Sequence, residues 1–106
     1  MDLNNTPYLD FIAKTFMPIV LSTGMSSFEE INNAVNVIEK TGNKKICILH
    51  CVSVYPSLKS FTNLNNIHSL RASFKNYPIG YSDHTLGDEV SIASAAIGSA
   101  YIEKHF

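Results

Sequence analysis

Short apolar runs alternate with amphipathic segments along this chain of 106 residues. Four compact runs rich in branched and aromatic side chains predict buried strands over residues 18–22, 45–50, 78–82 and 101–106. Helical periodicity predicts helices over about residues 6–14, 26–42, 64–74 and 87–98. Apolar strands separated by helices are typical of a parallel sheet with right-handed crossovers. The chain is therefore predicted to be one α/β domain, residues 1–106, in which a helix precedes each strand.

Two of the predicted helices have recognisable start signals. Asn5 and Thr6 precede Pro7, and proline at the first helical position lacks the amide hydrogen that would be unpaired there. Ser26 and Ser27 precede Glu29 and Glu30 at the spacing of a capping box. These signals place the first helix near residue 6 and the start of the second near residues 26 and 27.

Composition narrows the classes of function. With 45% hydrophobic and 16% charged residues the chain can bury a core, and its net charge of −1 includes no basic stripe that would track nucleic acid. Cys47 and Cys51 do not form a C-x-x-C motif, so we expect reduced thiols. The sequence starts without a signal-peptide pattern, and no apolar run approaches the roughly 20 residues of a membrane span. We expect a soluble, cytoplasmic protein with no nucleic-acid or membrane partner.

Polar side chains gather where the predicted strands end. In parallel sheets the carboxyl ends of the strands lie at one edge, which is where such folds place their sites. The polar positions at these ends are Ser22, Thr23, 50–53, 82–84 and 103–105. Four strands with their helices fit either a small open sheet or half of a (β/α)8 barrel, and the pattern alone leaves both possibilities open.

Residues two apart on a strand share a face, so Ser82 is predicted to lie beside His84 and Glu103 beside His105. If the last two strands are neighbours, the two imidazoles approach a common point and form a plausible pair of metal ligands. Water or substrate would complete such a catalytic site. Taken without further information, two ordinary hydrogen-bonded histidines explain the same pattern.

Other polar residues have both a structural and a functional interpretation. The serines at positions 22, 53 and 82 are either turn formers or hydroxyl donors to a phosphate or carboxylate, and Tyr55 is either a packed aromatic or a site residue. A carboxylate at Glu103, in an otherwise apolar strand, suggests a polar pocket in front of it. His50 is expected in the core and His68 on the surface.

Four motifs occur in a fixed order: STGM at 22–25, HCVSVYP at 50–56, GYSDHT at 80–85 and EKHF at 103–106. Together they resemble the N-acetylneuraminate synthase, or NeuB-like, family over essentially the whole chain. The resemblance implies a (β/α)8 barrel, of which this chain would form the last four β/α units. It also implies condensation of phosphoenolpyruvate with an N-acetylated amino sugar such as N-acetylmannosamine, assisted by Mn²⁺ or Mg²⁺. The four preceding strands, with phosphate-binding lysines, would then lie outside this chain.

The resemblance also implies roles for individual residues. His84 and His105 match the metal ligands of the family. The residues that match phosphoenolpyruvate-binding positions are Ser22, Ser53 and Ser82. Those that match positions near the amino-sugar acceptor are Tyr55, Asp83 and Glu103.

Two alternative functions remain open at this point. One is another phosphoenolpyruvate-dependent synthase that makes a 3-deoxy sugar acid. The other is a catalytically silent half-barrel that associates with itself, since an open sheet has two strand edges available for pairing. We expect a homo-oligomer, and we expect the isolated chain to be inactive.

Overall fold

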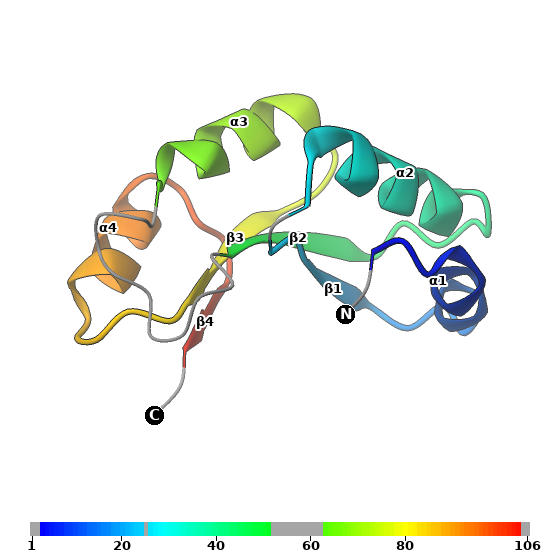
Figure 1. The fold of residues 1–106 in the computed structure, drawn as a ribbon, viewed down its shortest axis with the longest axis horizontal. Coiled ribbons are helices and arrows are strands. Elements are labelled where there is room, and N and C mark those ends of the chain that lie inside the picture. The colour runs from blue at the N-terminus through cyan, green and yellow to red at the C-terminus, as the bar shows by residue number, and fades with distance from the viewer. Residues whose placement is uncertain (1–2, 25, 52–62, 105–106) are drawn as a thin grey trace.

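The computed structural model describes residues 3–24, 26–51 and 63–104. Within these residues the elements are α1 Thr6–Ala13, β1 Ile19–Ser22, α2 Phe28–Glu39, β2 Ile46–Cys51, α3 Asn65–Ser73, β3 Ile79–Asp83, α4 Glu89–Ala96 and β4 Ile102–Lys104. The strands form one parallel sheet in the order β1-β2-β3-β4. Figure 1 shows the helices arranged in an arc along one side of this sheet. The predicted α/β fold is confirmed, and its sequential parallel strands form a half-barrel.

Helix starts follow the signals found in the sequence. The Asn5 side chain caps α1 by accepting a hydrogen bond of 3.3 Å from the backbone N–H of Tyr8, and Pro7 lies in the first turn. In α2 the Glu30 N–H donates to Ser27 Oγ at 3.2 Å, while the Ser27 N–H donates to Glu30 Oε1 at 3.0 Å. This reciprocal pair is the predicted capping box. None of the helices in the described ranges is long and apolar enough to cross a membrane.

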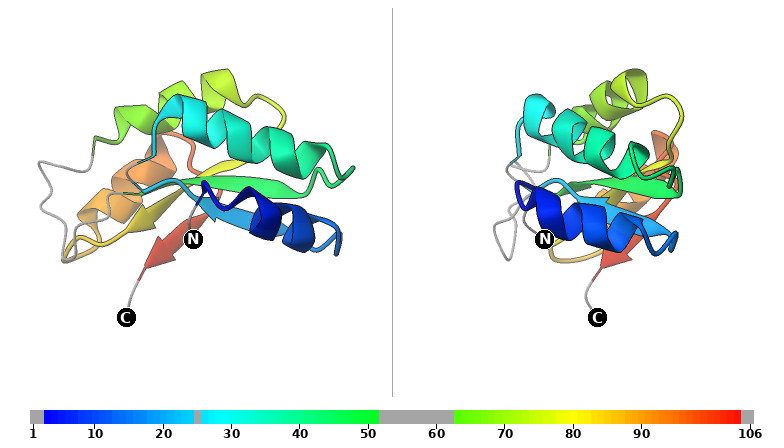
Figure 2. Two further views of the ribbon diagram at one scale, coloured as in Figure 1. Left: turned by 45° about the vertical axis from the view of Figure 1, so that its right-hand side comes forward. Right: turned by 90° about the vertical axis from the view of Figure 1, so that its right-hand side faces the viewer.

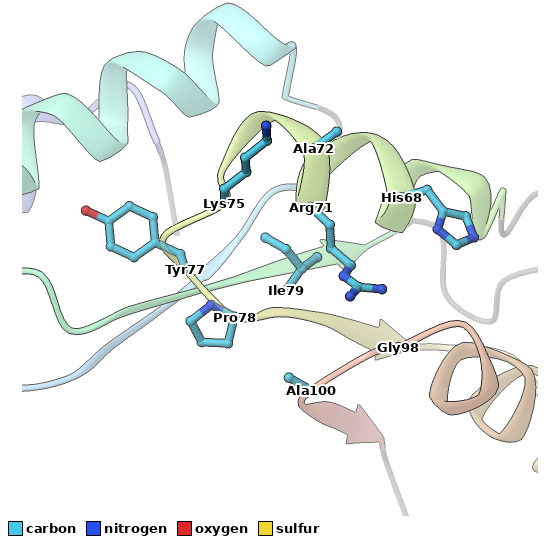
Figure 3. A pocket seen from close by; sticks show the side chains of 9 residues that line it. All are labelled: His68, Arg71, Ala72, Lys75, Tyr77, Pro78, Ile79, Gly98 and Ala100. Carbon is cyan, nitrogen blue, oxygen red and sulfur yellow. The ribbon is translucent and has the colours of Figure 1, made fainter.

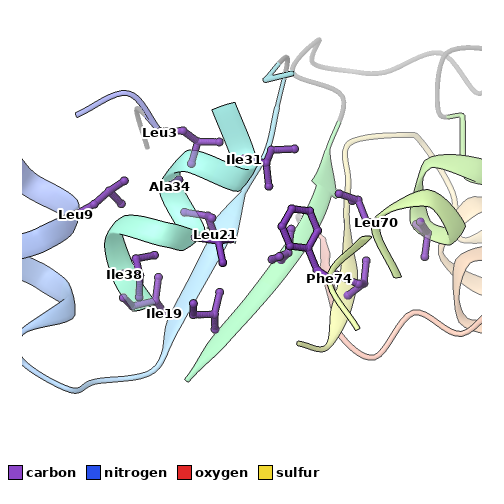
Figure 4. Packing of buried hydrophobic residues seen from close by; sticks show 14 of the residues in the cluster. Leu3, Leu9, Ile19, Leu21, Ile31, Ala34, Ile38, Leu70 and Phe74 are labelled. Atoms are coloured by element: carbon purple, nitrogen blue, oxygen red, sulfur yellow. The ribbon is translucent and has the colours of Figure 1, made fainter. Parts of the chain in front are cut away.

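The core lies between the sheet and its helices. Alternate strand residues point toward the helices, and Ile19, Leu21, Ile48 and Tyr81 are all 4% exposed or less. They pack against buried residues of the helices, as Figure 4 shows for part of this cluster. The helical members include Leu9, Ile31, Ile38 and Leu70. Burial on this face explains why the strands read as apolar runs.

The opposite face carries no helix of the described chain, and we call it the helix-free face (Figure 2). By strand alternation and register its residues include Val20, Ser22, Leu49, Gly80, Ser82 and Glu103. A Cβ atom built on Gly80 would lie only 2.4 Å from the Tyr101 carbonyl oxygen and 2.6 Å from Leu49 Cδ2. The backbone at Gly80 is therefore in close contact with the chain on both sides.

Histidine and cysteine positions agree with the sequence analysis. His50 is buried and its ring stacks on Tyr81, with ring centroids 5.7 Å apart, whereas His68 is exposed. Cys47 and Cys51 are reduced thiols, and burial raises the pKa of the Cys47 thiol. His50 is therefore a core residue rather than a candidate ligand.

Candidate functional site

The carboxyl end of β3 brings together two of the predicted site residues. Ser82 and His84 share the helix-free face, and Ser82 Oγ lies 3.4 Å from His84 Nε2. Ser82 is 3% exposed, and His84 directly follows the strand. The predicted proximity of this hydroxyl and imidazole is therefore confirmed.

Strand β4 adds a carboxylate to the same face. Glu103 is the register partner of Ser82 in the parallel pair β3 and β4, so the two residues lie side by side on neighbouring strands. The Glu103 side chain is exposed rather than buried in an apolar strand. Its carboxyl group is therefore accessible to a polar ligand.

Ser22 lies farther away along the same edge. It ends β1 and pairs in register with Leu49, whereas Ser82 pairs with Cys51, two residues further along β2. A separation of two strands and two residues corresponds to roughly 10 Å across the sheet and 7 Å along it. The described residues thus place Ser82, His84 and Glu103 together and leave Ser22 apart from them.

Three predicted site residues lie outside the described residues. They are Ser53, Tyr55 and His105. Their predicted roles remain predictions.

The Asp83 side chain does not lie on the helix-free face. It is completely buried and shares the helix-covered face with Tyr81, and the role near the acceptor that the resemblance implies for it stays a prediction. Its Oδ1 accepts hydrogen bonds from the Thr85 N–H at 2.9 Å and from Thr85 Oγ1 at 2.6 Å. Its Oδ2 accepts from Ser91 Oγ at 2.5 Å and from Lys104 Nζ at 3.1 Å. Both carboxylate oxygens of Asp83 therefore accept hydrogen bonds from neighbouring protein groups.

These contacts also determine the protonation state of Asp83. Burial raises the pKa of the carboxyl, but the hydrogen bonds from Ser91, Thr85 and Lys104 together outweigh burial and lower the pKa to about 2. The carboxylate is consequently ionised at neutral pH. Sequence analysis did not identify Lys104, Thr85 or Ser91, although alternation and register together would have paired Asp83 with Lys104.

The helix-free face offers one nitrogen donor for a divalent metal, the imidazole of His84. An imidazole ligand fits Mn²⁺ better than Mg²⁺, which strongly prefers oxygen ligands. Among residues 3–24, 26–51 and 63–104 no three His, Cys, Asp or Glu side chains form a metal-binding group. A complete metal site therefore needs groups beyond those described.

One cavity lies well away from these residues (Figure 3). It has a volume of about 480 Å³, and its lining includes Arg71 of α3, Lys75 just after this helix, Pro78 and Ala100. Because Pro78 and Ala100 precede β3 and β4, the cavity is at the amino-terminal edge of the sheet. It is not part of the carboxyl-edge cluster.

Known proteins similar to this chain include enzymes of sugar-acid synthesis. N,N'-diacetyllegionaminic acid synthase of Campylobacter jejuni is 46% identical, with 99% of this chain and 32% of that protein covered. The structure of spore coat polysaccharide biosynthesis protein SpsE of Bacillus subtilis matches with a TM-score of 0.96 and 35% identity, over 98% of this chain and 29% of that one. The structure of N-acetylneuraminic acid synthetase of Leptospira borgpetersenii matches with a TM-score of 0.93 and 37% identity, over 99% of this chain and 36% of that one.

The chain spans about a third of the length of the curated relatives it matches. The match to a family profile nevertheless runs over the whole chain, residues 1–106. It includes the strand ends that carry Ser82, His84 and Glu103. The chain belongs to the NeuB family.

Proposed function

We propose that the full-length protein condenses phosphoenolpyruvate with an N-acetylated amino sugar to give a nonulosonic acid. The observation that carries this proposal is the family match over residues 1–106, which includes the carboxyl-edge cluster of Ser82, His84 and Glu103. Two of the similar proteins are named as synthases of legionaminic acid and N-acetylneuraminic acid. On this basis we take the acceptor to be an amino sugar of this chemical class.

In this proposal the half-barrel is one part of a (β/α)8 barrel. Supporting evidence comes from the parallel strand order β1-β2-β3-β4, the helices along one side, and the greater length of the similar proteins. Closing such a barrel would turn the helix-free face into its interior. The carboxyl ends of the strands would then surround the substrates.

Each site residue has a proposed role. Ser82, together with Ser22 and Ser53, holds the phosphate and carboxylate of phosphoenolpyruvate through hydroxyl donors. Glu103 and Tyr55 bind the amino sugar. His84 and His105 hold a divalent metal, for which we favour Mn²⁺. Asp83 takes no direct part in substrate binding.

In the balanced reaction, phosphoenolpyruvate, the aldehyde form of the sugar and water are converted to the sugar acid and inorganic phosphate. C3 of phosphoenolpyruvate forms the new bond to the sugar aldehyde carbon, water adds at C2, and the C2–O bond to phosphate breaks. The metal supplies positive charge near the aldehyde oxygen when bound. Ser82 orients one substrate and Glu103 the other, which keeps the two carbons at reacting distance.

Phosphate release tests this proposal. Purified full-length protein is incubated with phosphoenolpyruvate, Mn²⁺ and one of a panel of N-acetylated amino sugars and aldose phosphates. Released inorganic phosphate is quantified, and the sugar-acid product is identified by mass spectrometry. Turnover of an amino sugar is expected. Turnover of aldose phosphates alone would instead indicate a 3-deoxy sugar-acid synthase and overturn the proposal.

Two histidine variants show whether the turnover depends on the proposed site. Replacing His84 with Ala should lower turnover more than the roughly 10- to 100-fold that loss of a supporting residue typically costs. Replacing His68, which is exposed on α3, should leave turnover unchanged. Equal activity of both variants would remove His84 from the site.

A self-associating half-barrel is the second candidate, favoured by the exposure of apolar residues on both edge strands. Val20 of β1 is 43% exposed, Ile102 of β4 is 39% exposed, and Tyr101 beside it is 47% exposed. Pairing through these edges would place a neighbouring strand beside them and reduce their exposure. Light scattering on the isolated chain tests this candidate, since a dimer is expected if the edges pair and a monomer if they do not.

A further inference from the structure

Lys104 crosses from β4 to the segment that carries His84. Its Nζ donates to the Thr85 carbonyl oxygen at 2.9 Å and to Asp83 Oδ2 at 3.1 Å. Asp83 and Thr85 are the two residues on either side of His84. A single ammonium group thus holds the backbone after His84 and the side chain before it.

Asp83 extends this contact to α4 and closes the turn around His84. The Thr85 N–H and hydroxyl both donate to Asp83 Oδ1, and the Ser91 hydroxyl of α4 donates to Oδ2. The network therefore joins the end of β3, the start of α4 and the end of β4. All of these atoms lie on the helix-covered side, behind the face that Ser82 and Glu103 occupy.

We propose that Asp83 and Lys104 form a positioning pair that orients His84 toward the helix-free face and fixes the ends of β3 and β4 relative to each other. This inference rests on the proposed function, because the orientation matters if His84 is a metal ligand. Lys104 also directly precedes His105 in the sequence, so the same side chain anchors the strand that leads to the second proposed ligand. Neither Asp83 nor Lys104 touches the metal or the substrates in this scheme.

The arrangement is better suited to positioning than to stability. An ion pair with one fully buried partner gains little net folding free energy, because desolvation of the charges offsets their attraction. A lysine that donates to a backbone carbonyl and a carboxylate at once instead fixes geometry. Supporting residues of this kind typically change metal affinity by about 10- to 100-fold.

The test uses Lys104→Met in the full-length protein, with Lys45→Met as the matched control. Lys45 also donates across to a backbone carbonyl, that of Phe16 at 3.2 Å, but it precedes β2 at the opposite edge of the sheet. Mn²⁺ affinity is measured by calorimetry, and melting with EDTA verifies that each variant is folded without metal. We expect Lys104→Met to weaken Mn²⁺ binding at least about 10-fold, Lys45→Met to leave it unchanged, and Lys104→Arg to restore part of the loss.

Hydrogen exchange provides a readout that needs no metal. In protein without metal, the Thr85 amide should exchange faster in Lys104→Met than in Lys45→Met, because the turn around His84 loses its anchor. If wild-type protein binds no Mn²⁺, the proposed function fails, and exchange at Thr85 alone decides whether the positioning pair of Asp83 and Lys104 holds the turn around His84. Folded Lys104→Met with wild-type Mn²⁺ affinity, or with wild-type exchange at Thr85, would overturn the inference.

Discussion

Replacing Gly80 with Ala should separate β3 from its neighbours. Gly80 is in the middle of β3, and a Cβ atom there would lie 2.4 Å from the Tyr101 carbonyl oxygen, 2.9 Å from Tyr101 Cβ and 2.6 Å from Leu49 Cδ2. Real Cβ contacts essentially never fall below 3.0 Å, so residue 80 and the Tyr101 carbonyl must move apart by at least 0.6 Å. That carbonyl accepts a hydrogen bond from the Tyr81 N–H at 2.8 Å and cannot simply turn away.

The expected cost follows from these contacts. Overpacking of a close-packed site costs about 1–3 kcal/mol, and weakening the hydrogen bond at Tyr101 adds up to about 1 kcal/mol. The lower entropy of the unfolded chain with alanine offsets about 0.4–1 kcal/mol. We therefore expect Gly80→Ala to lower the free energy of unfolding by about 2 kcal/mol, which corresponds to about 3 °C in the melting temperature of a protein of roughly 300 residues.

Urea unfolding and calorimetry of the full-length protein measure this cost, with Gly42→Ala as the control. At Gly42 the added Cβ meets only the Phe16 ring, at 3.7 Å, and the cost comes from the positive φ of 89°. Both variants should be less stable than wild type, but only Gly80→Ala should also weaken Mn²⁺ binding, because it displaces β4 relative to β3. A melting temperature of Gly80→Ala within 1 °C of wild type would refute the steric argument.

Three further predictions concern other parts of the chain. Ser27→Ala removes one half of the capping box and should cost about 1 kcal/mol in urea unfolding, without a change in catalysis. Tyr77→Phe loses the 2.6 Å hydrogen bond to Glu39 and should cost about 1 kcal/mol. Burial and, after it, Glu39 raise the pKa of Tyr77 to about 12. The difference in stability between wild type and Tyr77→Phe should therefore be fully present below pH 10 and disappear as the pH rises through about 12. Unfolding measured across this pH range tests this. Glu103→Gln should lower kcat with the amino sugar by about 10- to 100-fold and leave the KM for phosphoenolpyruvate within two-fold, whereas equal effects on both substrates would place Glu103 elsewhere.

Most of the fold could be predicted because helices bury one face of β1, β2 and β3, and each of these strands also pairs with a neighbouring strand. The apolar runs at 18–22 and 45–50 therefore mark β1 and β2 to within one residue at either end. The helix starts at Asn5 and Ser27 are local signals that depend on neighbours within four residues, and they too were predictable. The curvature that makes the sheet a half-barrel depends on packing between elements, and the hydrophobic pattern could not distinguish it from a flat open sheet.

The candidate site was predictable only in part. Alternation along β3 placed Ser82 beside His84, and this was confirmed. The exposure of Glu103 could not be foreseen, because it depends on which side of β4 is covered. Asp83 was assigned from the resemblance of a motif to a family, and a motif shows which residues occur together without showing the face on which each one lies.

The two motifs at the ends of β3 and β4 can now be understood in terms of strand alternation. In Ser82-Asp83-His84 the outer residues face the helix-free side and the middle residue faces the helices. In β4 Glu103 faces the helix-free side and Lys104 the helix-covered side. The register accordingly pairs Ser82 with Glu103 and Asp83 with Lys104. Substrate-facing groups and their supporting charges therefore occupy consecutive positions because a strand exposes opposite sides at each step. A change at Asp83 or Lys104 should consequently act on the site through the backbone of the two strands, although neither side chain reaches the face where the proposed chemistry occurs.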